Sequence, residues 1–424
     1  MAYTTVIEHF KKLCAIPHCS YEAQEMKKHL IKTCEGFGYA VSVDTVGNIL
    51  AKKESSKVTL QSHYDMVCIG THFPLELQEK EGWLSAKDST LGADNGIGMA
   101  MMLSLMEAGA LVDCLFTSEE EVGLIGARRL DLDLSTPYLL NLDSEDEGIV
   151  TIGCAGGVDI IATKQLQRQT KELHLYEYHV DGLAGGHSGV DIDKEIPNAI
   201  SLVFKKLCET DSFIVEVNGG ERRNSIPKKA DIVFGLSEVS PIDGTTYLGE
   251  KEVEVMGDSC DIIKTLADFE SGVRTLNSEL DIVQTSINLA LIESSQETLR
   301  VQLSGRSMDK KALERLELET SAYFSKEGFT VTSEGFYAPW KPEKSTFSDL
   351  VLYESQKIFD NAQYGAIHAG LECGIIKEKY NDILMASIGP TIRYPHSNRE
   401  QVELASVERV YLSLKNIIRN LNAS

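Results

Sequence analysis

The stretch VTLQSHYDMV, residues 58–67, begins as an apolar strand and ends with a histidine and an aspartate two positions apart. Side chains at i and i+2 of an extended chain point to the same face, so His63 and Asp65 are expected to lie side by side. One ring nitrogen of a histidine can ligate a metal while the other donates to a carboxylate that fixes the ring. The pair therefore suggests a metal ligand, His63, oriented by Asp65.

More acids, and a second histidine, follow other segments with strand character or begin a helix. They are Asp94 in GADNGIG, Glu120 and Glu121 in CLFTSEEE, Asp143 in YLLNLD and His396 in GPTIRYPHSNRE. Carboxylates gathered at one sheet edge repel one another unless cations offset their charge. Two histidines with several carboxylates suit Zn²⁺, Mn²⁺ or Co²⁺. One Asp can bridge two such ions, which then hold a shared water and lower its pKa.

Each of these motifs is weak when it is taken alone. A single His or Asp at a strand end is usually a cap or a solvated group, and EEE is ordinarily an exposed charge run. GADNGIG could pass for a phosphate loop, but it lacks the Lys and Ser/Thr of a P-loop and carries an acid where phosphate would lie. We expect Asp94 at a helix start instead, where backbone N–H groups and the helix dipole hold an anion. HExxH and GxSxG do not occur in the sequence.

The elements that would position these residues alternate between helix and strand. Helical periodicity covers Thr4–Leu13 and Ala23–Cys34, and a strong helix is predicted over Gly96–Ala108. Strand-like runs include residues 58–62 and the segments LVDCLFTS, PYLLNLD and GIVTIG. This alternation predicts an α/β fold with a mainly parallel sheet flanked by helices. Its functional crevice is expected beyond the carboxyl ends of the strands.

The pattern changes after about Gly157. Alternating strands such as LHLYEYHVDGL and KADIVFGL mix with two long helices, NAISLVFKKLCE and KKALERLELETSAYFSKEG, which favours an α+β layer. Near the C-terminus, the sequence again has the strand and helix pattern of the first part of the chain. We therefore expect a catalytic domain over residues 1–157 and 337–424, with an inserted α+β lid domain over residues 158–336.

The amino-acid composition limits the kinds of binding partner and the cellular compartment that can be expected for this protein. The 424 residues carry 41 basic and 64 acidic side chains, a net charge of −23, which argues against nucleic-acid and anionic-membrane partners. No apolar run is long enough to span a bilayer, and the N-terminal segment lacks a signal-peptide core. Cys68, Cys114, Cys154 and Cys208 have apolar neighbours, as buried thiols in a reducing compartment do. A cytoplasmic location is expected.

The motifs, in their order, resemble a known family. SHYDMV, GADNGIGMAMML, TSEEEVGLIGA, NLDSEDEG, GGHSGVDI, AIHAGLECG and SIGPTIRYPHS are similar, segment by segment, to the cytosolic Xaa-His (aminoacyl-histidine) dipeptidases. These belong to a larger superfamily of di-zinc aminopeptidases and carboxypeptidases with an inserted lid domain. The resemblance covers nearly the whole chain.

The resemblance implies roles for the candidate residues. Asp94 would bridge two divalent ions, with zinc the first expectation and manganese or cobalt as alternatives. His63 and Asp143 would complete one metal site, and Glu121 and His396 the other. Glu120 would be the general base and Asp65 would orient His63. The peptide bond after Asp94 is expected to be cis.

Substrate contacts are also implied. His187 in GGHSG resembles the lid histidine that steadies the oxyanion or the substrate carboxylate, in its own site or in that of a dimer partner. Arg306 in LSGRS would bind the peptide carboxylate, assisted by Asn224. Glu372 is expected either to hold the substrate amino group or to be structural, and His368 to be structural. A homodimer through the lid domain is expected.

These expectations converge on a cytosolic dipeptidase that hydrolyses small peptides, of the Xaa-His type or with broader specificity. A tripeptide aminopeptidase or an N-acyl-amino-acid deacylase of the same superfamily would use the same metal centre with different lid contacts. A binding or scaffold protein that merely retains the fold is the third alternative. The segment DKEIPNAI departs from relatives, which commonly carry basic or histidine residues there, and this bears on substrate choice.

Overall fold

The computed structural model describes residues 2–423, which divide into two compact units. Unit 1 consists of Met1–Cys154, Pro342–Ala366 and Leu371–Ser424, and unit 2 of Ala155–Lys341 and Ile367–Gly370. The boundaries expected from the sequence lie a few residues from these divisions. The sequence did not suggest that residues 367–370 belong with unit 2. Met1 and Ser424, the ends of the expected catalytic domain, lie outside the described residues.

Unit 1 is built on an eight-stranded sheet in the order β1-β2-β6-β3-β7-β21-β8-β20. The strands are β1 (Ala40–Val43), β2 (Ile49–Lys52), β3 (Val58–His63), β6 (Asp113–Thr117), β7 (Tyr138–Asn141), β8 (Ile149–Cys154), β20 (Gln363–Ile367) and β21 (Leu384–Ser387). The central strands β6, β3, β7 and β21 run parallel, while β1, β2 and β8 pair antiparallel beside them. The predicted α/β class, with a parallel core of the sheet, is confirmed.

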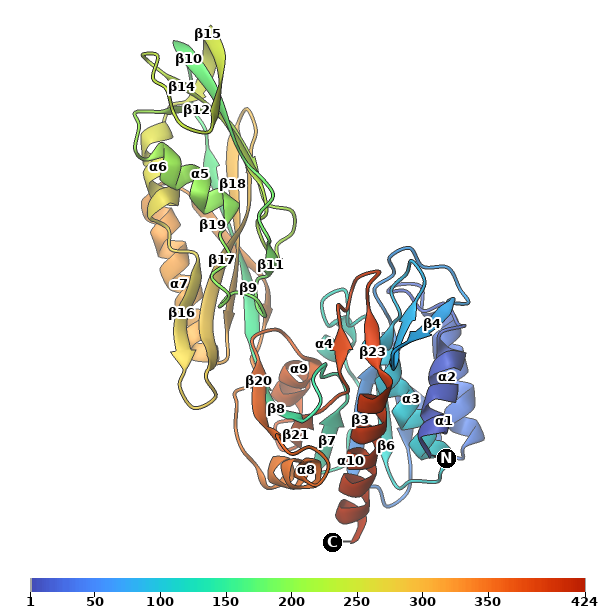
Figure 1. The fold of residues 1–424 in the computed structure, drawn as a ribbon. Coiled ribbons are helices and arrows are strands. Elements are labelled where there is room, and N and C mark those ends of the chain that lie inside the picture. Colours follow the sequence, from blue (N-terminus) through green and yellow to red (C-terminus); the bar gives the residue numbers. More distant parts are fainter. Residues whose placement is uncertain (1, 424) are drawn as a thin grey trace. The chain divides into compact units, whose positions relative to one another are not determined.

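Helices pack around this sheet, as Figure 1 shows. They are α1 (Ala2–Leu13), α2 (Gln24–Gly36), α3 (Ala93–Glu107), α4 (Ile125–Arg128), α8 (Thr346–Gln356), α9 (Glu372–Lys379) and α10 (Leu404–Ala423). Helix α3 is apolar on all sides and almost wholly buried, which holds its first turn firmly in place. It begins three residues before the predicted start. A small sheet adds β4 (Leu77–Lys80), β5 (Trp83–Ala86), β22 (Ile392–Arg393) and β23 (Gln401–Glu403).

Unit 2 is an antiparallel sheet with helices along one face (Figure 1). Its strands are β9 (Gly156–Gln165), β10 (Arg168–Val180), β12 (Phe213–Gly219), β14 (Ala230–Leu236), β15 (Thr245–Met256), β16 (Gly272–Asn277), β17 (Ile282–Ser294), β18 (Thr298–Ser307) and β19 (Thr330–Tyr337). The helices are α5 (Ala199–Leu207), α6 (Ser259–Asp268) and α7 (Lys310–Lys326). The α+β prediction is confirmed, although α6 was not predicted. A separate two-stranded pair joins β11 (Gly186–His187) to β13 (Ser225–Ile226).

The cysteines depart in part from the sequence-based expectation. Cys114 and Cys154 are buried thiols, as predicted, but Cys208 is exposed because it caps the C-terminus of α5 beyond that helix's apolar face. Cys68 forms a disulfide with Cys19. The prediction failed for Cys68 because a bridge between Cys19 and Met66 aligns two segments that are distant in sequence. Among residues 2–423, no helix is long and apolar enough to cross a membrane.

Candidate metal centre

The candidate residues of unit 1 come from the carboxyl ends of neighbouring strands. His63 is the last residue of β3, Glu119–Glu121 follow β6, and Asp143 follows β7 by two residues. Because β3 pairs in parallel with both β6 and β7, these three ends meet at one edge of the sheet. Asp94 lies in the first turn of α3 and His396 in the loop after β22.

The two oxygens of Asp94 face different histidines. Its Oδ1 lies 3.0 Å from Nε2 of His63, and its Oδ2 lies 3.1 Å from Nε2 of His396. His63 Nε2 is also 3.4 Å from Asp143 Oδ1, and His396 Nε2 is 2.8 Å from Glu121 Oε2. The structure therefore arranges the five predicted residues as two imidazole–carboxylate groups that share Asp94.

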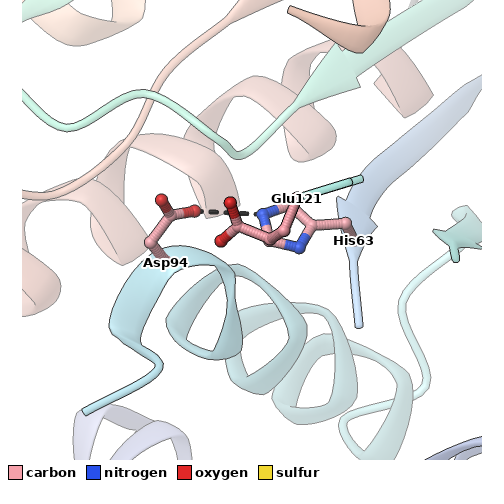
Figure 2. A group of neighbouring side chains, drawn as sticks. All are labelled: His63, Asp94 and Glu121. Atoms are coloured by element: carbon pink, nitrogen blue, oxygen red, sulfur yellow. Dashed lines mark hydrogen bonds and ion pairs between the residues drawn. The ribbon is translucent and has the colours of Figure 1, made fainter. Parts of the chain in front are cut away.

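Three of these side chains meet the geometric requirement for holding a metal ion. One donor atom each from His63, Asp94 and Glu121 lies within 4.8 Å of the others (Figure 2). The second oxygen of Glu121, Oε1, is buried without a hydrogen-bond partner among the described residues. A buried carboxylate oxygen without a partner is costly, and a cation beside it would remove that cost. The donor set and this oxygen both fit a divalent metal.

Electrostatics point the same way. Burial raises the pKa of the Glu120 carboxyl well above its ordinary value, and it raises those of Glu121 and Asp143 as well. Burial lowers the pKa of His63, but the Asp143, Asp65 and Asp94 carboxylates facing the ring outweigh it and raise that pKa well above its usual range. The acids outnumber the imidazoles, so the cluster favours an added positive charge.

Asp65 orients His63 in a different way from the one expected. Nδ1 of His63 lies 2.9 Å from the backbone carbonyl oxygen of Asp65 and 3.6 Å from its carboxylate. The ring nitrogen therefore donates to the main chain, while the carboxylate stays within ion-pair distance of the ring and also accepts hydrogen bonds from other groups. It accepts the N–H groups of Glu120, at 2.9 Å, and Glu121, at 3.3 Å, and the hydroxyl of Ser20, at 2.8 Å. Asp65 thus fixes the backbone of the EEE segment.

The start of α3 contains the expected cis peptide bond, between Asp94 and Asn95. Asn95 is buried and donates from Nδ2 to the carbonyl of Leu142 at 2.9 Å and to the Asp143 carboxylate. A β-carbon at Gly98 would lie 2.2 Å from Asn95 Oδ1, so glycine is required there. The backbone N–H groups at this helix start bind an anion, as expected. However, the anion is the carboxylate of Glu400, whereas the sequence had suggested that of Asp94.

The predicted substrate residues are divided between the two units. Glu372 lies in unit 1, fully buried at the start of α9, where its Oε2 accepts from Gln61 Nε2 and Thr117 Oγ1, each at 2.6 Å. Its Oε1 has no hydrogen-bond partner among the described residues, and burial raises its pKa to about 8. His187, Asn224 and Arg306 belong to unit 2.

In unit 2 the structure brings His187 and Asn224 close together. Strands β11 and β13 pair, and the N–H of Ser188 donates to the carbonyl of Asn224 at 2.9 Å. Nδ1 of His187 accepts from the N–H groups of Gly189 and Val190, at 3.2 and 3.1 Å. The neutral ring therefore carries its proton on Nε2, where it can be donated.

Arg306 is nine-tenths buried in β18. Its guanidinium donates to the hydroxyl of Tyr337 at 2.9 Å, while its Nε has no partner among the described residues. Ser286 lies opposite Arg306 on β17, and its hydroxyl is 2.7 Å from Nε2 of His368. His368 is buried, and burial together with Arg306 lowers its pKa to about 3, which keeps it neutral.

Ser20, Ser286, Tyr337 and Glu400 were not predicted as residues of the site. The first three are ordinary polar residues on strands or loops, with no local signal that separates them from surface groups. Glu400 lies four residues after His396, and that short spacing is the one signal that could have drawn attention to it.

The chain was compared with protein-family models and with known proteins. No protein-family model matches it. It is 31% identical to the cytosol non-specific dipeptidase of Escherichia coli (strain K12) over an alignment of 471 residues, which covers 98% of this chain and 97% of the relative. The chain belongs to the cytosol non-specific dipeptidase family.

Solved structures of peptidases are similar to this chain over nearly its whole length. The aminoacylhistidine dipeptidase from Vibrio alginolyticus is 29% identical and superposes with a TM-score of 0.81, covering 98% of this chain and 96% of that one. A tripeptidase from Staphylococcus aureus is 16% identical with a TM-score of 0.61 and covers 100% of this chain and 99% of that one. The tripeptidase shares the fold, while the two dipeptidases are the relatives with the higher sequence identity.

Proposed function

We propose that this protein is a metal-dependent dipeptidase. The observation that carries the proposal is the position of Asp94, whose two oxygens face His63 and His396 separately. Membership of the cytosol non-specific dipeptidase family supports it. The tripeptidase and N-acyl deacylase alternatives are not favoured, because two relatives that are 31% and 29% identical over nearly the whole chain are dipeptidases.

In this proposal the unit 1 cluster holds two divalent ions. Asp94 would be the ligand that both ions share, with His63 and Asp143 as the further ligands of one ion and Glu121 and His396 as those of the other. Zinc is the first candidate because imidazole and carboxylate ligands suit it, with manganese or cobalt as substitutes. When bound, such ions polarise a carbonyl oxygen and lower the pKa of water.

Glu120 serves as general base. It takes a proton from the attacking water, whose oxygen bonds to the scissile carbonyl carbon, and then passes the proton to the departing amine as the C–N bond breaks. The hydrogen bonds that the Asp65 carboxylate accepts from the backbone N–H groups of Glu120 and Glu121 fix the position of the base.

The remaining residues recognise the ends of a dipeptide. Arg306, with Asn224, binds the carboxylate of the substrate, since the Nε of its guanidinium has no hydrogen-bond partner among the described residues and can contribute to a bidentate contact. Glu372 binds the α-ammonium group through Oε1, which has no hydrogen-bond partner in the described part of the chain. His187 donates from Nε2 to the oxyanion as it forms.

Two further proposals concern the surroundings of the enzyme. The name of the Escherichia coli relative supports a cytosolic location. The family resemblance supports a homodimer formed through unit 2, and light scattering of the purified protein would give its molar mass.

The function is tested by metal analysis joined to a substrate panel. We expect two equivalents of divalent metal per chain, loss of activity on chelation and its return when metal is added back. Free dipeptides, including aminoacyl-histidine dipeptides, should be hydrolysed, whereas a tripeptide and N-acetyl or N-succinyl amino acids should not. A purified protein without metal and without metal-restored activity would refute the proposal.

A further inference from the structure

The glycine-rich turn before α3 binds a carboxylate supplied by a distant part of the chain. Glu400 is buried, with 2% of its surface exposed. Its Oε2 accepts the N–H groups of Leu91, at 2.8 Å, and Gly92, at 3.0 Å. Its Oε1 accepts those of Ala93, at 2.7 Å, and Asp94, at 3.2 Å. Both oxygens are therefore occupied by four successive backbone donors.

The backbone is shaped for this contact. Gly92 has φ of +68°, in the left-handed region, and a β-carbon there would lie 2.8 Å from the sulfur of Met66. Consecutive N–H groups in such a turn, at the N-terminus of a helix, form a concave anion site. A phosphate loop uses the same geometry to bind a ligand. In this protein the carboxylate of Glu400 occupies the anion site, so the site stabilises the fold and does not bind a phosphate.

Glu400 also belongs to the segment that carries the second histidine. Its own N–H donates to the carbonyl of Ser397 at 3.1 Å, one residue beyond His396. The carboxylate therefore joins the turn that ends at Asp94 to the loop that delivers His396. These are the two residues whose side chains face each other at 3.1 Å.

We propose that Glu400 is a positioning residue that sets the distance between Asp94 and His396 and thereby the geometry of the shared metal ligand. The inference rests on the proposed function, since it assigns Glu400 to the metal centre. Charged hydrogen bonds are the strong ones, and groups that hold a metal ligand from behind typically change metal affinity or activity about 10- to 100-fold when they are removed.

The test compares Glu400→Gln with the wild-type protein and with Asp309→Asn. The amide keeps the size of the side chain but turns one of the two acceptors into a donor that opposes the backbone N–H groups. Asp309 is a matched control because it is another carboxylate at a helix start, accepting from Ala312 N at 3.0 Å, but in unit 2. Metal-free proteins are titrated with Co²⁺, and visible absorption reports both affinity and ligand geometry.

We expect Glu400→Gln to bind Co²⁺ about 10- to 100-fold more weakly with shifted absorption bands, and Asp309→Asn to match the wild type. Unchanged Co²⁺ affinity and spectrum in Glu400→Gln, even with a lowered melting temperature, would overturn the inference while leaving the proposed function intact. A wild-type protein that binds no Co²⁺ would overturn both. If Glu400→Gln does not fold, Glu400→Asp keeps the charge on a shorter side chain and is judged by the same criterion.

Discussion

The two units each bury charged groups, but of opposite sign. In unit 1 the cluster around Asp94 and Glu120 is rich in carboxylates, and burial raises the pKa of Glu120, Glu121 and Asp143. In unit 2 the buried guanidinium of Arg306 is a cation, and burial together with Arg306 lowers the pKa of His368 to about 3. Each of these opposes further charge of its own sign. The first is suited to cations and the second to an anion, which are the two things a metal-dependent dipeptidase must bind.

The substitution Glu120→Gln is the strongest test of the role proposed for the acidic cluster of unit 1. Loss of the general base should reduce kcat about 1,000-fold, since acid–base groups contribute roughly 10²–10⁴, while metal content stays at the wild-type level. Steady-state kinetics and metal analysis of the same preparation measure both. Glu119→Gln is the matched control, because Glu119 accepts from the N–H of Tyr21 at 2.7 Å and has no assigned role in catalysis. Near-normal turnover by Glu120→Gln would contradict the assignment.

The substitution Arg306→Lys tests whether Arg306 of unit 2 binds the carboxylate of the substrate. A lysine keeps the charge but not the planar fork, so we expect kcat/KM for dipeptides to fall about 100-fold, mainly through KM, without change in metal content. Against a dipeptide amide, which has no carboxylate, the variant and the wild type should differ little. Arg223→Lys, in the ion pairs with Asp159 and Glu334, is the control. An equal loss on both substrates would argue against carboxylate recognition.

The low pKa of His368 makes unit 2 sensitive to acid. A histidine that is neutral in the folded state and ordinary when unfolded gives stability that is complete above about pH 6.5 and is lost as pH falls toward 3. Between pH 7 and 5 the free energy of unfolding should therefore fall by about 2 kcal/mol more in the wild type than in His368→Gln. Urea unfolding at both pH values measures this.

Ser286→Ala is the control for that measurement. It removes the same hydrogen bond, between the Ser286 hydroxyl and Nε2 of His368, but leaves the titrating ring in place. Its pH dependence should follow the wild type even though its stability is lower. A Ser286→Ala protein that behaves like His368→Gln would show that the hydrogen bond, and not the titration, causes the effect.

The smallest expected effect is that of Ser20→Ala. The Ser20 hydroxyl donates to Asp65 at 2.8 Å, and Asp65 holds the backbone of Glu120, so its loss should lower kcat only about five-fold, the equivalent of a hydrogen bond worth ~1 kcal/mol. Ser56→Ala removes a comparable hydroxyl at the other end of β3, where Ser56 donates to the carbonyl of Val58 at 3.0 Å. Identical kinetics for the two variants would remove Ser20 from the account of the site.

The metal-site candidates could be predicted from sequence because they depend on short-range patterns. His63 and Asp143 follow apolar strands, and parallel strands end at the same sheet edge, so local periodicity was enough to place them together. What the sequence could not supply was long-range. Glu400 reaches the turn before Asp94 across about three hundred residues, and Cys19 reaches Cys68 through a bridge between two loops.

The role of Asp65 shows a subtler limit. Its spacing from His63 was correct, but sequence cannot distinguish a contact through the carboxylate from one through the carbonyl of the same residue. The structure has the latter, and this leaves the carboxylate to hold Glu120 and Glu121. Helix α6 was missed for a similar reason, since its short amphipathic segment lies among strands of comparable composition.

The assignment of residues 367–370 to unit 2 bears on how these enzymes could be recombined. The chain passes between the units four times, and the last excursion is only four residues long yet carries His368. A chimera that exchanged the continuous stretch 155–341 with that of a relative would leave His368 behind, facing a foreign Ser286 position. Grafting one enzyme's selectivity onto another would therefore need both stretches to be transplanted together.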